Sequence, residues 1–159
     1  MRILMILVPG NLDRPLLQIR QVIEPYYLFR DSGAVVVLAS PGGGSPISTA
    51  NRQDQTPAVR RLRRDHMARE ALAETLSLDQ VSADDFQAAF CIGACELIEA
   101  GGDHAVSLLT AQLLDAGKPV AVLSDKNGVR LLITGNAPRP AAQALLGALS
   151  SSSGESTPR

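Results

Sequence analysis

Two pairs of neighbouring side chains in this sequence combine groups that can move a proton or hold an anion. Cys95 precedes Glu96, and Asp13 precedes Arg14. Cys95, Glu96 and Asp13 are candidate catalytic groups, because a thiol or a carboxyl can act as a general acid or base. Arg14 is a candidate for binding a substrate carboxylate or carbonyl, since a guanidinium donates paired hydrogen bonds to such groups.

Each pair also has a structural explanation that the sequence leaves open. Asp13 can cap a helix that begins near Pro15, with Arg14 in solvent. Cys95 can be a small residue that fits a loop, with no chemical role. A neighbouring carboxylate raises the pKa of a thiol, which weakens the case for a thiolate nucleophile here.

Apolar runs and the segments between them predict the elements that position these groups. Continuous runs of strand length predict buried strands at Arg2–Val8, Ala34–Ala39, Ala88–Ile92 and Val120–Leu123. The intervening segments predict helices at Pro15–Arg30, Asp65–Ser77 and Asp103–Ala116. This alternation predicts a doubly wound α/β fold, with a mainly parallel sheet and helices on both faces.

The end of the chain is expected to depart from this alternation. Val129–Ile133 is a further predicted strand, and Asn127-Gly128 before it favours a tight turn. We therefore expect a C-terminal antiparallel hairpin at the edge of the sheet. Residues 1–149 are predicted to form a single domain, and the Ser-rich residues 150–159 a disordered tail.

Ligands of such sheets bind beyond the carboxyl ends of the strands, at one edge of the sheet. Both pairs follow predicted strands, and so do Ser124 and Asn136. We therefore assign Ser124 and Asn136, together with Arg14, as candidate substrate-binding residues for a small organic molecule.

Composition argues against several other classes of protein. A net charge of −1 gives no sign of a nucleic-acid partner or of an anionic membrane surface as a partner. The apolar run at Arg2–Val8 is too short for a membrane span or a signal peptide. Two Cys and two His do not match a zinc pattern, so no metal and no cofactor is expected. With so few cysteines a disulfide scaffold is not expected, and we expect a cytoplasmic protein.

Several stretches, met in order along the chain, resemble the ThiJ/PfpI superfamily. They are Glu24–Phe29 with Gly33-Ala34, Ala39–Gly43, Leu78–Phe90, Ala116–Ala121 and Leu132–Pro138. The similar branch contains glutathione-independent glyoxalases, chaperone-like proteins and predicted intracellular amidases. The resemblance implies a flavodoxin-like fold, of the kind found in class I glutamine amidotransferases, and a homodimer.

The departures from this family fall at the residues of its chemistry. The family uses an elbow cysteine, a Glu on the first helix and a Gly-Gly-His-Gly type loop after the third strand. Here the loop has Cys95 in place of the His, the helix has Arg20 or Gln21 in place of the Glu, and the elbow has Leu123-Ser124. Either Ser124 replaces the elbow cysteine and the next helix is missing, or the whole elbow is deleted.

We therefore expect the family's thiolate chemistry to be absent. The first hypothesis is a repurposed small-molecule cleft with cofactor-free acid–base catalysis, of the isomerase, cyclase or lyase type. The alternative is a non-catalytic dimeric binding or structural protein, since loss of a covering segment would expose apolar surface.

Overall fold

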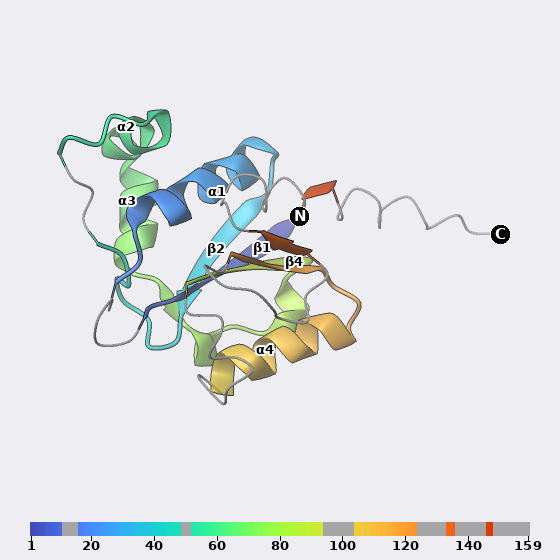
Figure 1. Ribbon diagram of the computed structural model, residues 1–159. Coiled ribbons are helices and arrows are strands. Elements are labelled where there is room, and N and C mark those ends of the chain that lie inside the picture. The colour runs from blue at the N-terminus through green and yellow to red at the C-terminus, as the bar shows by residue number, and fades with distance from the viewer. Residues whose placement is uncertain (11–15, 49–51, 94–103, 124–132, 136–145, 148–159) are drawn as a thin grey trace.

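The computed structural model describes residues 1–10, 16–48, 52–93, 104–123, 133–135 and 146–147. They form one six-stranded sheet in the order β3-β2-β1-β4-β5-β6, with all neighbours parallel (Figure 1). The strands are β1 (Arg2–Val8), β2 (Val35–Ser40), β3 (Leu76–Ser77), β4 (Ala88–Gly93), β5 (Val120–Leu123) and β6 (Ile133–Gly135). The helices are α1 (Ile19–Asp31), α2 (Pro57–Arg64), α3 (His66–Ala73) and α4 (His104–Asp115), with 3-10 turns at Leu78–Gln80 and Ala83–Asp85.

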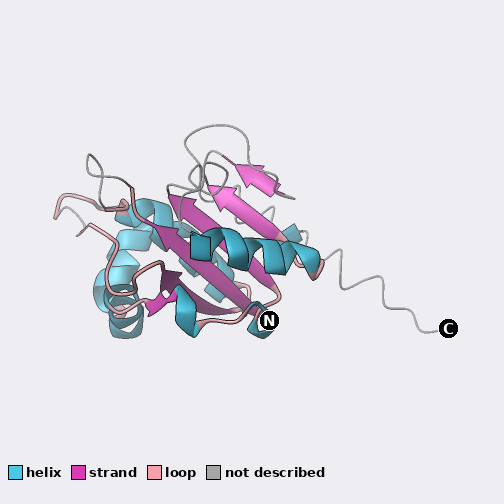
Figure 2. Ribbon diagram, turned by 90° about the horizontal axis from the view of Figure 1, so that it is seen from below, coloured by secondary structure: helices cyan, strands magenta, loops and turns pink. Residues whose placement is uncertain are grey.

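Helices cover both faces of the sheet, as predicted for a doubly wound, flavodoxin-like fold. In Figure 1, α1, α2 and α3 lie on one side of the strands and α4 lies on the other. In Figure 2, which is seen from below, α4 lies in front of the strands. Successive residues of β1 serve the two faces alternately. Met5 belongs to the core cluster under α1–α3, whereas Ile6 belongs to the cluster that packs against α4.

The core is aliphatic around a small number of aromatic rings. Phe29 of α1 packs edge-on against Phe90 of β4, with ring centroids 5.5 Å apart. Phe86 fills the opposite face, where it is 2 % exposed. The contact between Phe29 and Phe90 fixes α1 against the centre of the sheet, and so fixes where the loop before α1 ends.

The predicted helix Asp65–Ser77 is shorter in the structure and is followed by a strand. Asp65 caps α3, because its carboxylate accepts a hydrogen bond of 3.0 Å from the Ala68 N–H. Beyond Ala73 the chain leaves the helix, and Thr75 exchanges backbone hydrogen bonds with Gly44. This pairing draws the next two residues into β3, parallel to β2.

The predicted C-terminal antiparallel hairpin is wrong. β6 runs parallel to β5, with Ala121 opposite Ile133 and Leu123 opposite Gly135. An Asn-Gly pair favours a turn locally, but it does not determine the direction of the strand that follows. The parallel sheet extends by one more edge strand instead.

Two other predictions concern residues outside the described ones. The tail at 150–159 lies there completely, and the single domain at 1–149 stays a prediction. No helix among the described residues is long and apolar enough to cross a membrane.

Candidate functional site

The order of the strands reverses between β1 and β4, in the middle of the sheet. From β1 the chain proceeds outward through β2 and β3, and it then returns to the other side of β1 for β4, β5 and β6. In sheets of this kind the ligand crevice lies outside the carboxyl ends of the strands at such a switch point. The paired ends here are Val8 of β1 and Gly93 of β4.

The carboxyl ends of β5 and β6 lie next to those of β1 and β4. Ile92 of β4 lies opposite Leu123 of β5, which in turn lies opposite Gly135 of β6. The carboxyl ends of four strands are therefore adjacent, as the sequence analysis required for a common site.

The predicted site residues all lie outside the described residues. In the sequence they follow these four strand ends within six residues: Asp13 and Arg14 after β1, Cys95 and Glu96 after β4, Ser124 after β5 and Asn136 after β6. Their side-chain arrangement therefore stays a prediction, and the described structure supplies only the strand ends that precede them.

Gly93 makes a close approach that only glycine allows. Its φ is +111°, and a methyl group at its Cα would overlap the Val8 carbonyl oxygen and lie 2.7 Å from Cδ2 of Leu17. The backbones of β1 and β4 are thus in contact at the switch point, with Leu17 packed over the glycine. This packing forms the base of the candidate site, at the carboxyl ends of β1 and β4 and immediately before residue 94 in the sequence.

Loops after β1 and β2 are joined beside this base. Leu17 forms a short parallel bridge with Ile47, through backbone hydrogen bonds from Leu17 N–H to Pro46 O and from Ser48 N–H to Leu17 O. The Ser48 hydroxyl also donates to Leu17 O. These bonds hold the loop that leads into α1, which begins two residues after Leu17.

The glycine run after β2 does not have the geometry of a phosphate cradle. Gly43 and Gly44 have positive φ angles of 70° and 77°. Their N–H groups donate to Ser40 O and Thr75 O respectively, so both donors are already used. The glycines instead let the loop approach Thr75 and pair with the segment before β3.

Where the resembled family has a Glu on its first helix, this chain has Arg20 or Gln21, and Arg20 forms an ion pair. Arg20, in the first turn of α1, donates from Nε to the Asp54 carboxylate at 2.5 Å. The other oxygen of Asp54 accepts the Thr56 N–H at 3.0 Å. The Arg20 hydrogen bond, helped by that of Thr56, lowers the pKa of Asp54 to about 2. Asp54 is therefore a fixed anion near neutral pH, and it is committed to Arg20.

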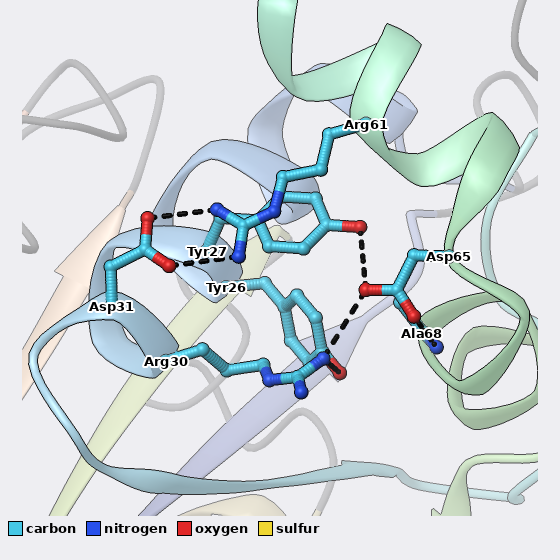
Figure 3. Close-up of polar contacts among 7 residues, drawn as sticks. All are labelled: Tyr26, Tyr27, Arg30, Asp31, Arg61, Asp65 and Ala68. Carbon is cyan, nitrogen blue, oxygen red and sulfur yellow. Dashed lines mark hydrogen bonds and ion pairs between the residues drawn. The ribbon is translucent and has the colours of Figure 1, made fainter.

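A polar network that the sequence analysis missed connects α1 with α2 and α3 (Figure 3). The Arg61 guanidinium donates twice to Asp31, at 2.8 Å each, and lies 3.9 Å from the centre of the Tyr27 ring. The Tyr27 hydroxyl and Arg30 both donate to Asp65, at 3.1 and 3.3 Å. Burial, and then the bond to Asp65, raises the pKa of Tyr27 far above its usual value, so Tyr27 stays a donor.

Among the described residues no group of three or more His, Cys, Asp or Glu is placed to hold a metal ion. The network of Figure 3 is built from groups that satisfy one another, which is typical of a structural clamp between helices. The edge of the sheet at the switch point is therefore the candidate site, and the network supports the helix that leads away from it.

Comparison with known proteins places this geometry among solved folds. No protein-family model matches the chain, and no curated protein matches it. Among solved structures, a ThiJ/PfpI domain protein from Brachyspira murdochii is similar with a TM-score of 0.59 and 19 % identity, over 94 % of this chain and 96 % of that one. This chain has the ThiJ/PfpI fold.

Two further solved structures are similar to this chain and differ from each other in length. A protein designated APC35852 has a TM-score of 0.71 at 18 % identity, over 95 % of this chain and 98 % of its own. Glyoxalase III from Candida albicans has a TM-score of 0.58 at 15 % identity, over 77 % of this chain and 56 % of its own. The fold thus occurs both at about the present length and in a longer protein.

Proposed function

We propose that this chain is a cytoplasmic, diverged ThiJ/PfpI-like protein with a repurposed cleft, which binds a small organic molecule and catalyses a cofactor-free acid–base reaction. The supporting observation is the switch point between β1 and β4. Its paired ends, Val8 and Gly93, directly precede the two segments that carry the proton-transfer candidates. In sheets of this kind ligands bind outside the carboxyl ends of the strands at such a switch point.

The proposed chemistry is of the isomerase, cyclase or lyase type. One carboxylate, Glu96 or Asp13, removes a proton from the substrate, and a protonated group on the other segment returns a proton elsewhere. The step changes no oxidation state, so it needs no redox cofactor. Arg14, Ser124 and Asn136 are proposed to hold the substrate's oxygen atoms.

The surroundings of α1 support the loss of thiolate chemistry. In the family that the sequence resembles, the carboxyl that shares a proton with the nucleophilic thiol projects from the first helix. The residues at the matching positions of α1 are Arg20 and Gln21, and Arg20 is paired with Asp54. We propose that Cys95, which the sequence places after β4, therefore acts beside Glu96 in proton transfer and is not a nucleophile.

The first prediction is that the purified chain does not consume methylglyoxal. The loss of hemithioacetal and the formation of lactate would be followed with and without glutathione, with Candida albicans glyoxalase III as the positive control. We expect a rate equal to that of buffer, because the thiolate and its partner carboxyl are missing. Turnover that Cys95→Ala abolishes would contradict the proposal.

The second prediction concerns ligand binding at the switch point. A library of small organic acids, ketones and lactones would be screened by amide chemical shifts in ¹⁵N-labelled protein. We expect hits to move the amides of Val8, Gly10 and Gly93, and Glu96→Gln to weaken their binding about tenfold or more, as expected for a lost charge-assisted hydrogen bond.

Glu74→Gln is the matched control for that experiment, since Glu74 is exposed at the end of α3, far along the chain from the site. It should leave the affinity of each hit unchanged. Hits that bind elsewhere, or that bind Glu96→Gln as well as the natural chain, would show that the site is wrongly assigned.

The alternative function, a non-catalytic dimeric binding or structural protein, is supported by the outer edge of β2. β3 pairs only with Ala39 and Ser40, so Val35–Leu38 have no strand on that side within the described part of the chain. Val35 is 58 % exposed. An unpaired apolar edge favours pairing with a second chain, and a homodimer is proposed on this basis. A screen without hits at the switch point would favour this alternative.

A further inference from the structure

The seam between α1 and α2 holds three charged side chains of α1, spaced by one and by two helical turns. Arg20, Glu24 and Asp31 lie on the side of α1 that faces α2 and the loop before it, as the contacts of the two end members show. Arg20 pairs with Asp54 at one end, and Asp31 pairs with Arg61 at the other. Opposite charges therefore meet across the seam at both ends.

Glu24 breaks this pattern. It lies one turn after Arg20 and two turns before Asp31, and it makes no hydrogen bond or ion pair with any described residue. The segment facing it supplies Pro57 and Ala58, which carry no charge. Glu24 is half-buried, and its charge interacts at a distance with Arg20 one turn earlier, whose own hydrogen bond goes to Asp54. Glu24 is therefore the acidic residue of the seam that has no hydrogen-bonded partner among the described residues.

A pocket of about 250 Å³ opens at this gap. Its walls include Leu28, Pro57 and Ala58, which are apolar, and Glu24 lies among them. The pocket is slightly smaller than most ligand sites, so its occupant must be small.

The other charged members of the lining neutralise each other. Both terminal nitrogens of Arg61 donate to Asp31, so this pair adds no net charge. The guanidinium of Arg61 also covers a face of the Tyr27 ring, and the Tyr27 hydroxyl is bound to Asp65 (Figure 3). The net charge left in the pocket is the negative charge of Glu24.

We propose that this pocket binds a small aliphatic primary amine in its ammonium form. The ammonium would donate hydrogen bonds to Glu24, and the alkyl chain would lie on Leu28, Pro57 and Ala58. A quaternary ammonium suits the pocket less well, because it donates no hydrogen bond and a face of the Tyr27 ring is already taken by Arg61. This site is separate from the switch point and does not depend on the function proposed there.

The test is a titration of ¹⁵N-labelled protein with n-butylammonium chloride at constant, low ionic strength. We expect saturable shifts at the amides of Glu24, Leu28 and Ala58. n-Butanol, with the same chain but no charge, and tetramethylammonium, with the charge but no donor, should each bind at least about fivefold more weakly.

Two variants keep the test decisive. Glu24→Gln should weaken binding about tenfold or more, whereas Glu74→Gln, the same change at an exposed position, should leave it unaltered. Ala58→Leu fills the pocket without altering its charge and should also remove binding. Shifts that do not saturate, equal binding of n-butanol, or full affinity in folded Glu24→Gln or Ala58→Leu would overturn the proposal.

Discussion

Gly93→Ala is expected to lower the free energy of unfolding by about 3–5 kcal/mol, the largest effect of a Gly→Ala change among the described glycines. Two costs combine at this position. A φ of +111° is a conformation that side chains with a Cβ rarely adopt, and the added methyl would overlap the Val8 carbonyl and press on Leu17. The Val8 carbonyl belongs to the central strand β1, which is hydrogen-bonded on both sides and cannot withdraw.

Gly117→Ala separates the two costs. Gly117 closes the turn after α4 with a φ of +72°, and a methyl group there would meet nothing within 4 Å. Only the backbone cost of about 1–2 kcal/mol applies. Urea unfolding of both variants, followed by circular dichroism, measures the difference.

A third variant tests which contact matters at Gly93. Leu17→Ala combined with Gly93→Ala removes the side chain but leaves the Val8 carbonyl in place. We expect no recovery of stability, because the backbone overlap remains. If Gly93→Ala were as stable as Gly117→Ala, the close contact between β1 and β4 at the switch point would be wrong.

The central strands could be predicted from the sequence alone because they are buried on both faces. The apolar runs Arg2–Val8 and Val120–Leu123 coincide with β1 and β5. Such a run has strand length, has no polar face and ends where the chain must return to solvent. The same burial explains why the alternation of strands and helices along the chain could be predicted from these runs.

The edge strands could not be predicted in this way. β3 consists of Leu76 and Ser77, and it exists because the segment before it pairs with Gly44, more than thirty residues away. Leu76 is 41 % exposed, so no apolar run marks the strand. The direction of β6 likewise depends on its pairing with β5 and not on the Asn-Gly pair that precedes it.

For the candidate site, too, one part could be predicted from the sequence and another could not. That its residues follow adjacent strand ends is a property of topology, which the alternation of elements predicts. The network of Figure 3 is a property of how helices pack, and its pairs join positions such as Asp31 and Arg61 that no local pattern connects. Arg61 itself is exposed, yet it is paired with Asp31 and stacked on the Tyr27 ring.

Asp65→Ala is expected to lower the free energy of unfolding by about 2–3 kcal/mol, which is large for a residue so near the surface. One carboxylate serves three contacts there. It caps α3 through the Ala68 N–H, and it accepts from Tyr27 and Arg30 of α1. Its removal leaves the buried Tyr27 hydroxyl without its acceptor.

Asp65→Asn separates the helix cap from the charge. Asn caps helices as well as Asp does, so this variant should keep α3 and lose only part of the contacts to α1, a cost of about 1 kcal/mol. Chemical unfolding at neutral pH measures both variants. Equal stability of Asp65→Ala and the natural chain would show that α1 and α3 are held together by apolar packing alone.

The pH dependence of that difference gives a second, independent test. Hydrogen bonding from Ala68, and then from Tyr27, lowers the pKa of Asp65 below its usual value of 3.8. In acid the unfolded chain therefore takes up a proton at this carboxyl before the folded chain does, and stability falls with pH. The advantage of the natural chain over Asp65→Asn should be complete above about pH 5 and should shrink as the pH falls below 3.8. A difference that stayed constant down to the acid transition would show that the charge of Asp65 does not cause it, and would contradict this account.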